Sequence, residues 1–394
     1  MELHFTNLLA VSTIAFVAPL ALGLVPGLKL PAVVLELVAG IVFGPAGLNW
    51  IKIDDPIAVI SLLGLAMLLF LAGLEVEFDK LRGSLLHAAL LGFAASFAIA
   101  LMVGLGLHAA GWVKSPVFVA IALSATSLGV VVPVLKDSDL ASSPFGQLII
   151  AAASIADVAT IVLLSLLFSK EASSLTAKFV LLGGLAALAA AVAVAVLLAK
   201  RSMRIGTALV NLQDTTAQIR IRGAMLLLIA FAAIAQKLGL EVILGAFIAG
   251  ALVSILDSDQ EMTHPEFRLK LTAIGYGVFI PVFFVTSGLR FDLNALTQDT
   301  STLLRVPVFL AALLAARGLP ALLYRERLHD DRKVVVAGLL QATSLPFLVT
   351  STQIDLTLNV LTPATASGLV AAGLLSVLIF PLASLTLLSR PQAA

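Results

Sequence analysis

Apolar residues along this chain gather in long uninterrupted runs, separated by short stretches that carry charges, proline or glycine. Runs of roughly 15 to 25 apolar residues have the length of helices that cross a bilayer, and they do not alternate as the strands of a membrane barrel do. The pattern therefore predicts an all-α polytopic membrane protein, with thirteen transmembrane helices in one membrane domain over residues 1–394. Their approximate ranges are 6–25, 30–44, 57–77, 84–110, 115–136, 146–169, 179–199, 223–236, 239–256, 270–289, 303–324, 333–353 and 363–388.

The composition excludes several other classes of protein. Hydrophobic residues make up 60% of the 394 positions and charged residues 12%, against roughly 25% charged residues in soluble domains. With a mean hydropathy of +1.11, the chain lacks the polar side chains that would cover a soluble enzyme. A net charge of +1 leaves no basic surface for nucleic acid, and the absence of cysteine excludes thiolate metal sites and thiol catalysis.

Basic residues in the predicted loops indicate the orientation. If the N-terminus lies outside, the cytoplasmic loops hold sixteen lysines and arginines and the outer loops hold seven. Cytoplasmic loops of membrane proteins are enriched in these residues. We therefore expect a multi-pass protein of the cell (inner) membrane, with the N-terminus outside and the C-terminus in the cytoplasm. The first residues lack a signal-peptide pattern, so the first apolar run is expected to be retained.

Three segments of the first half recur in the second half in the same order. LELVAGIVFG (35–44) resembles LGAFIAGALV (244–253), FLAGLEVEFDKL (70–81) resembles FVTSGLRFDLNAL (284–296), and ATSLGVVVP (125–133) resembles ATSLPFLVT (342–350). Aligning Gly40 with Gly250, Gly73 with Gly288 and Thr126 with Thr343 gives offsets of 210, 215 and 217 residues. Each offset spans seven predicted helices, an odd number, so the copies would be inverted. The sequence predicts a first repeat over 1–170, a linker helix over 171–205 and an inverted six-helix repeat over 206–394, a plan typical of secondary transporters.

Asp157 is the strongest candidate for a residue that binds a cation or a proton. It is the only charged residue between Asp139 and Lys170, and it lies near the middle of the span 146–169. A charge at bilayer depth costs at least about 2.5–3.5 kcal/mol, so such a residue is a functional candidate. An ionised carboxylate is a ligand for a small cation, whereas a protonated one is neutral and easily buried. The alternative is a structural carboxylate that is paired with a buried cation.

Two matched hydroxyl pairs form the second candidate group. Thr126 with Ser127, and Thr343 with Ser344, lie mid-span beside glycine or proline. Interrupted helices at corresponding positions of two repeats point to a transport site, where freed carbonyls and hydroxyls can bind a cation. Ser154, three residues before Asp157, lies on nearly the same helix face and would complete the oxygen shell. The alternative is that single hydroxyls bond back to their own helix.

Arg317 is a fixed charge inside the span 303–324. Arginine does not lose its proton in proteins, so a buried guanidinium needs a carboxylate or carbonyl oxygens. Glu36 in the second span and Glu75 near the inner end of the third are candidate partners. For all three, a structural or modulating role is as good an interpretation as a direct role in transport.

Together these segments resemble the monovalent cation:proton antiporters of the second type, a family that includes bacterial sodium/proton antiporters and potassium efflux proteins. The motifs that carry the resemblance are LPAVVLELVAGIVFGPAGL (30–48), LLFLAGLEVEFDKLR (68–82), ALSATSLGVVVPVLKD (122–137), ASIADVATIVLL (153–164), LGAFIAGALVS (244–254) and PVFFVTSGLRFDL (281–293).

The resemblance implies a homodimer with a rigid dimerisation domain and a mobile core that moves like an elevator. In the core, spans 115–136 and 333–353 would be broken and cross beside 146–169. The cation-binding aspartate of the family maps onto Asp157, its broken-helix hydroxyls onto Thr126 and Ser127, and its basic residue of the eleventh span onto Arg317.

Two positions depart from electrogenic relatives, which carry two adjacent aspartates and a lysine in the eleventh span. Here Ala156 replaces the first aspartate and Arg317 replaces the lysine. A nucleotide-binding pattern, which some relatives append, does not follow the last span, so gating through such a domain is not expected.

We therefore predict a transporter, not an enzyme, that exchanges sodium or potassium for protons in pH homeostasis. Exchange is expected to be electroneutral, through alternating access and competition at Asp157, without a cofactor. The alternative is a sodium-coupled symporter of organic anions with the same architecture, which would need a larger polar cavity and dedicated sodium sites. A channel would need pore-lining polar stripes, which the sequence lacks.

Overall fold

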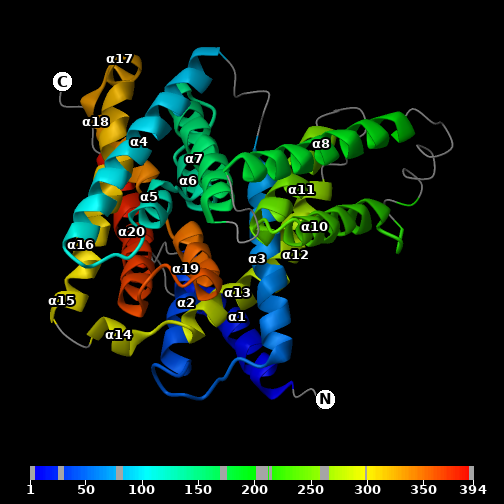
Figure 1. The fold of residues 1–394 in the computed structure, drawn as a ribbon, viewed down its shortest axis with the longest axis horizontal. Coiled ribbons are helices and arrows are strands. Elements are labelled where there is room, and N and C mark those ends of the chain that lie inside the picture. The colour runs from blue at the N-terminus through cyan, green and yellow to red at the C-terminus, as the bar shows by residue number, and fades with distance from the viewer. Residues whose placement is uncertain are drawn as a thin grey trace. The chain divides into compact units, whose positions relative to one another are not determined.

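The computed structural model describes residues 5–24, 31–76, 83–168, 175–200, 212, 215–257, 266–297 and 300–389 (Figure 1). Every regular element in these ranges is helical, and none of them contains a strand. In the first half the helices are α1 (Thr6–Leu24), α2 (Ala32–Phe43), α3 (Asp55–Glu75), α4 (Gly83–Ala109), α5 (Pro116–Ser124), α6 (Leu128–Asp137), α7 (Pro144–Phe168) and α8 (Leu175–Lys200). In the second half they are α10 (Ile219–Lys237), α11 (Val242–Asp257), α12 (Glu266–Ile274), η1 (Gly275–Phe279), α13 (Ile280–Leu289), α14 (Leu293–Thr297), α15 (Thr300–Leu303), α16 (Arg305–Leu313), η2 (Leu314–Gly318), η3 (Leu319–Tyr324), α17 (Arg325–Leu328), α18 (Asp331–Gln341), α19 (Pro346–Leu358) and α20 (Pro363–Ser389).

Thirteen apolar helical stretches coincide with the thirteen predicted segments. Within the described ranges, nine are long and apolar enough to cross a membrane and four are shorter. This confirms the prediction of an all-α polytopic membrane protein, while the exact number of crossings stays a prediction. Several basic residues that support the predicted orientation lie outside the described residues, among them Lys29, Lys80, Arg82, Arg201 and Arg204.

The chain divides into two compact units, each of which combines segments from both halves of the sequence. One contains residues 54–78 and 161–283, and the other contains 2–53, 79–160 and 284–394. The division does not test the predicted repeat boundaries at residues 170 and 206, which stay predictions.

In the first unit, α3 and α11 approach each other at two glycines. A Cβ added to Gly250 would lie 1.9 Å from the carbonyl oxygen of Phe70, and one added to Gly73 would lie 2.2 Å from that of Phe247. No side chain fits at such distances, so only glycine allows the two backbones to come this close.

In the second unit, α2 and α13 make the same kind of contact. A Cβ on Gly40 would lie 2.2 Å from the carbonyl oxygen of Val285, and one on Gly288 would lie 2.1 Å from that of Leu37. The duplication aligned Gly40 with Gly250 and Gly288 with Gly73. Each unit therefore contains one copy of the same glycine contact, and each contact joins a helix of the first half to a helix of the second half.

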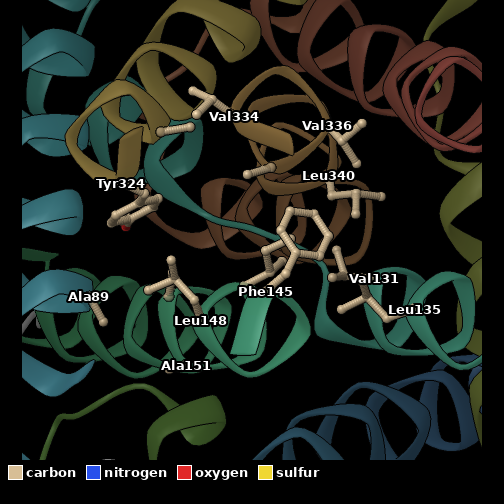
Figure 2. Close-up of a cluster of buried hydrophobic side chains, with 14 residues drawn as sticks. Ala89, Val131, Leu135, Phe145, Leu148, Ala151, Tyr324, Val334, Val336 and Leu340 are labelled. Carbon is tan, nitrogen blue, oxygen red and sulfur yellow. The ribbon is translucent and has the colours of Figure 1, made fainter. Parts of the chain in front are cut away.

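The apolar core of the second unit is built where α6, α7, η3 and α18 meet (Figure 2). Phe145 and Leu148 of α7 belong to the same buried cluster as Val131 of α6, Leu340 of α18 and Tyr324 of η3. Since well-packed interiors resist deformation, this cluster fixes α7 against both helices that the sequence predicts to be broken.

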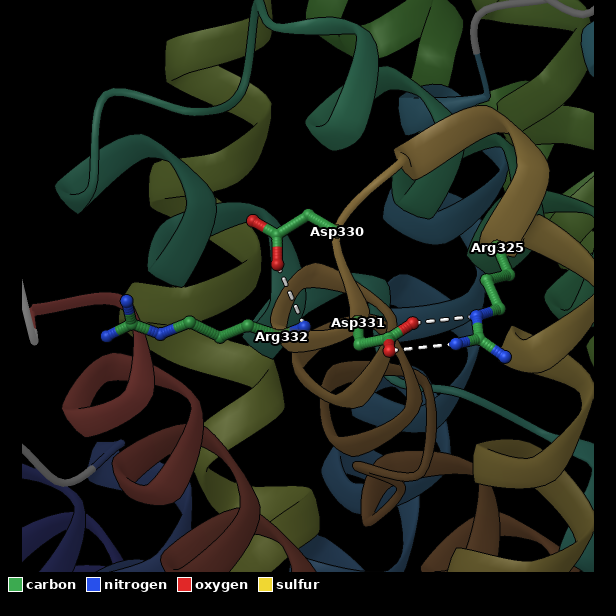
Figure 3. A network of polar contacts seen from close by, with 4 residues as sticks. All are labelled: Arg325, Asp330, Asp331 and Arg332. Carbon is green, nitrogen blue, oxygen red and sulfur yellow. Dashed lines mark hydrogen bonds and ion pairs between the residues drawn. The ribbon is translucent and has the colours of Figure 1, made fainter. Parts of the chain in front are cut away.

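Polar side chains fix the start of α18 (Figure 3). Asp330 caps the helix by accepting a hydrogen bond from the backbone N–H of Arg332 at 2.9 Å. The guanidinium of Arg325 forms two bonds with the Asp331 carboxylate, at 2.7 and 2.9 Å. Both side chains of this ion pair are more than half exposed, so the pair orients the turn but contributes little stability.

Candidate functional site

Both predicted interruptions are present as breaks in helical structure. The first segment leaves the helix at Ala125 and resumes at Leu128, with extended backbone at Ala125 and Ser127. The second ends α18 at Gln341 and resumes at Pro346. Pro346 is the first residue of α19. Proline is tolerated at this position because the backbone N–H that it lacks would have no partner within the first turn of the helix. Pro133, by contrast, lies within α6 and not at the first break.

The two breaks are hydrogen-bonded to each other. The backbone N–H of Ser127 donates to the carbonyl oxygen of Thr343 at 2.8 Å. The hydroxyl of Thr126 donates to the carbonyl oxygen of Gln341 at 2.7 Å. Each break thus supplies hydrogen-bond partners for polar backbone groups of the other. Backbone groups at membrane depth need such partners within the protein, because lipid offers none. The structure brings Thr126 and Ser127 together with Thr343, as the sequence proposed for a joint site.

The second break is also tied to α20. The backbone N–H of Ser344 donates to the hydroxyl oxygen of Ser376 at 3.0 Å, and the Ser376 hydroxyl donates to the carbonyl oxygens of Gly373 and Ser344 at 2.7 and 3.2 Å. The sequence analysis did not identify Ser376. Its only signal is that it is one of several hydroxyls in a mostly apolar span, which is common in packed membrane helices.

Arg317 lies at the first break. It belongs to the π-helical turn η2 and is 1% exposed. Its Nε donates to Thr126 Oγ1 at 2.7 Å, and its Nη1 donates to Ser96 Oγ on α4 at 3.2 Å. The Ser96 hydroxyl donates in turn to the carbonyl oxygen of Ala316 at 2.6 Å. The guanidinium is therefore held by hydroxyl oxygens of the first break and of α4, at a local π-helical turn of the type that often marks functional sites.

Neither predicted carboxylate partner is bonded to Arg317. Glu36 is 3% exposed, and its Oε2 has no hydrogen-bond partner among the described residues. Glu75 belongs to the other compact unit. Tyr324 and, after it, Asp157 are the titratable groups that act electrostatically on the Arg317 guanidinium. Glu36 is not among the hydrogen-bond partners of Arg317.

Asp157 and Ser154 lie on α7, in the same compact unit as both breaks. Asp157 is half-buried, and its neighbour Ala156 is fully buried. The Ser154 hydroxyl donates to the carbonyl oxygen of Ile150 at 2.9 Å, which leaves its lone pairs free to bind a cation. α7 therefore presents one carboxylate and one hydroxyl oxygen, three residues apart on the helix.

Several buried polar atoms at the breaks carry no hydrogen bond in the described part of the chain. They include Ser127 Oγ and Ser344 Oγ, and both polar atoms of the Gln341 side chain. Buried polar groups are almost always satisfied, so unmatched ones mark a place for a ligand or water. The sequence analysis did not identify Gln341 as a site residue. The available signal is that this glutamine, directly before the second ATSL segment, is a polar residue inside an apolar span.

The donors gathered here are all oxygen atoms: one carboxylate, several hydroxyls and the carbonyls freed at the two breaks. Such a set suits a small, hard cation and offers nothing to a thiophilic metal. A single carboxylate balances one positive charge, whether a monovalent cation or a proton carries it.

Comparisons with known proteins point to one family. The family described as "Sodium/hydrogen exchanger, transmembrane" matches residues 12–388. A putative Na+/H+ antiporter of Bacillus subtilis is 30% identical over 98% of the chain, and a probable Na+/H+ antiporter of Methanocaldococcus jannaschii is 26% identical over 86% of it. The chain spans 63% of the length of the first relative and 85% of the second.

A solved structure supports the same architecture. The sodium proton antiporter structure from Methanocaldococcus jannaschii matches 98% of the chain and 99% of its own length, with a TM-score of 0.65 at 18% identity. At this identity the likeness shows the fold.

Proposed function

The chain belongs to the sodium/hydrogen exchanger family, and we propose that it exchanges sodium or potassium for protons across the cell membrane. Membership in this family makes it a transporter and not an enzyme, as the sequence predicted. The observation that carries the proposal is that the two helix breaks are hydrogen-bonded to each other and to Arg317, in the same compact unit as Asp157.

Asp157 would bind the cation and the proton in competition. With its proton the site is neutral, and with a monovalent cation it is neutral again, so both loaded forms can cross between the two sides. Ser127 Oγ, which lacks a hydrogen bond, and Ser154 Oγ, which has free lone pairs, would supply neutral oxygen ligands. Thr343 and Ser344 would contribute through the freed carbonyls and the unmatched Ser344 hydroxyl at the second break.

Thr126 would bind the cation with a single remaining lone pair. Its hydroxyl donates to the carbonyl of Gln341 and accepts from Arg317, and a hydroxyl oxygen has two acceptor positions. Its main contribution in this proposal is to tie the two breaks and Arg317 together, while Ser127 is the more available ligand.

Exchange would be electroneutral because only one group at the site changes charge. The position before Asp157 is Ala156, which has no proton to release. Arg317 stays protonated at physiological pH and therefore acts as a fixed charge that shapes the site. Glu36 and Glu75 would modulate the field from a distance.

The proposal also covers the repeats, the oligomeric state and the membrane orientation of the chain. Inverted repeats over 1–170 and 206–394, joined by a linker over 171–205, would form a core that alternates its access between the two sides. The chain would assemble as a homodimer, with the N-terminus outside and the C-terminus in the cytoplasm. Its role would be pH homeostasis.

Proteoliposomes that contain the full chain and an internal pH dye test the proposal. With an acid interior, sodium or potassium chloride alone should dissipate the pH gradient, whereas an organic-anion symporter would stay silent until its substrate is added. The Asp157→Asn variant keeps the size of the side chain but cannot carry a proton, and it should be inactive. Near wild-type exchange by Asp157→Asn would show that the site is elsewhere.

A further inference from the structure

A pocket of about 430 Å³ lies in the second unit where the end of α13, the helix α19 and the start of α20 meet. We call it the polar pocket. The polar residues that line it include Arg290, Asp292, Thr352, Gln353, Asn359 and Ser367. None of these residues is part of the site at the two breaks.

The lining indicates what fills this pocket. A larger pocket of about 650 Å³ in the same unit is lined by apolar side chains and Thr300, a surface that suits lipid chains. The polar pocket instead mixes two charged side chains, amides and hydroxyls with apolar residues such as Phe291, Leu361 and Val370. In a chain that crosses a bilayer, such groups face water-filled cavities because lipid cannot satisfy them.

The polar pocket is connected to the broken helices through α19. That helix starts at Pro346, directly after the second break, and contributes Thr352 and Gln353 to the pocket wall. With a rise of 1.5 Å per residue, Thr352 lies about 9 Å along α19 from Pro346, its first residue. The wall of the pocket and the second break therefore belong to one continuous segment of the chain.

The charges in this pocket are not matched to each other. The Arg290 guanidinium donates to the Gln353 side-chain oxygen, which is neutral. One oxygen of Asp292 accepts a hydrogen bond from the backbone N–H of Ala295 at 2.8 Å, which caps α14. The structure records no ion pair between Arg290 and Asp292. The positive charge of Arg290 therefore acts on whatever occupies the pocket.

We infer that the polar pocket is the water-filled vestibule through which the cation reaches the broken helices from one side of the membrane, and that Arg290, held by Gln353, limits cation occupancy there. This inference rests on the proposed exchange activity. Arg290 is a positioning and field-setting residue and does not touch the bound cation.

Charged thiol reagents test the vestibule without any transport measurement. The natural chain has no cysteine, so a Thr352→Cys variant carries the only reactive thiol. It should react with membrane-impermeant methanethiosulfonates, one bearing a trimethylammonium group and the other a sulfonate, from one side of the vesicle only. Leu375→Cys, in the apolar pocket, is the matched control that should stay unreactive. The exposed Thr297→Cys confirms that the reagents work. Absence of reaction at Thr352→Cys would overturn the vestibule.

The ratio of the two reaction rates reports the field of Arg290. A unit charge about 8 Å away in water changes the rate of one singly charged reagent about 2.4-fold, and so the ratio of the two oppositely charged reagents about six-fold. Adding Arg290→Gln should raise the cationic-to-anionic ratio by this factor, whereas Arg290→Lys should leave it unchanged. An unchanged ratio in Arg290→Gln would show that Arg290 does not act on the pocket.

Transport measurements then place the vestibule on the cation path. Arg290 repels a proton as strongly as a monovalent cation. Arg290→Gln should therefore lower the cation KM about two-fold at alkaline pH, where protons do not compete, and leave it unchanged at acid pH. An unchanged KM at every pH would remove the pocket from the path. If the wild-type chain exchanged nothing, the proposed function would fail while the labelling result stood on its own.

Discussion

The backbone N–H of Ser127 bonds to the carbonyl oxygen of Thr343 at 2.8 Å, so the breaks of two helices from opposite halves of the chain meet directly. Both residues lie in the non-helical backbone of the two breaks. The bond keeps the hydroxyl of Ser127 beside a freed carbonyl, and it makes the geometry of one break depend on the other. A cation site formed at this place would use atoms from both breaks at once.

Neighbouring hydroxyls at the first break should respond differently to mutation. Ser127→Ala removes an oxygen that makes no hydrogen bond, so the melting temperature in detergent should stay unchanged while the cation KM rises about ten-fold, the effect of about 1.4 kcal/mol. Thr126→Val removes bonds to Gln341 and Arg317, so it should lower stability by about 1–3 kcal/mol. Equal effects of both variants on stability would contradict this division of roles.

Arg317 should be needed for the structure of the site. A lysine cannot reach Thr126 and Ser96 as the guanidinium does, so Arg317→Lys should keep part of the activity and melt at a lower temperature. Arg317→Ala should lose about 1.5–3 kcal/mol of stability for each charged hydrogen bond removed. The exposed Arg325→Ala, which breaks the ion pair with Asp331, is the control and should cost less than about 1 kcal/mol. Normal melting of Arg317→Ala with exchange lost would instead indicate a direct role in transport.

Glycine contacts provide a test of the duplication. Gly40→Ala places a methyl group against the backbone of Val285, and Gly250→Ala places one against that of Phe70. Each variant should lose at least about 1–3 kcal/mol of stability, as overpacked interiors do. Gly106→Ala on α4 meets nothing within 4 Å and is the control. Melting curves in detergent measure all three, and a stable Gly40→Ala beside an unstable Gly250→Ala would argue against equivalent contacts.

Much of this fold follows from the sequence pattern because a bilayer imposes long apolar helices and leaves few alternatives. The two breaks were also predictable, since ATSL recurs in both halves beside glycine or proline. The break of the first helix comes at Ala125–Ser127, where the predicted hydroxyls lie, while Pro133 lies within α6. Proline signals a weakened helix, and the neighbouring contacts decide where the helix actually ends.

The hydrogen-bond partners of the Arg317 side chain could not be predicted from the sequence pattern. The sequence offered Glu36 and Glu75 for Arg317, since charge is visible along the chain. The guanidinium is bonded instead to Thr126 and Ser96, which come from distant segments and carry no charge. Such contacts depend on which helix faces pack together, and periodicity in long apolar segments does not determine those faces.

If Asp157 exchanges one monovalent cation for one proton, the balance point of exchange in proteoliposomes does not depend on the membrane potential. The membrane potential is set independently while opposing cation and proton gradients are varied until net exchange stops. Moving one net charge through 100 mV is worth about 2.3 kcal/mol, so any net charge movement is easily detected. We expect the balance point to stay the same at every imposed potential; a balance point that moves with the potential would show that net charge crosses in each cycle and that one-for-one exchange at Asp157 is wrong.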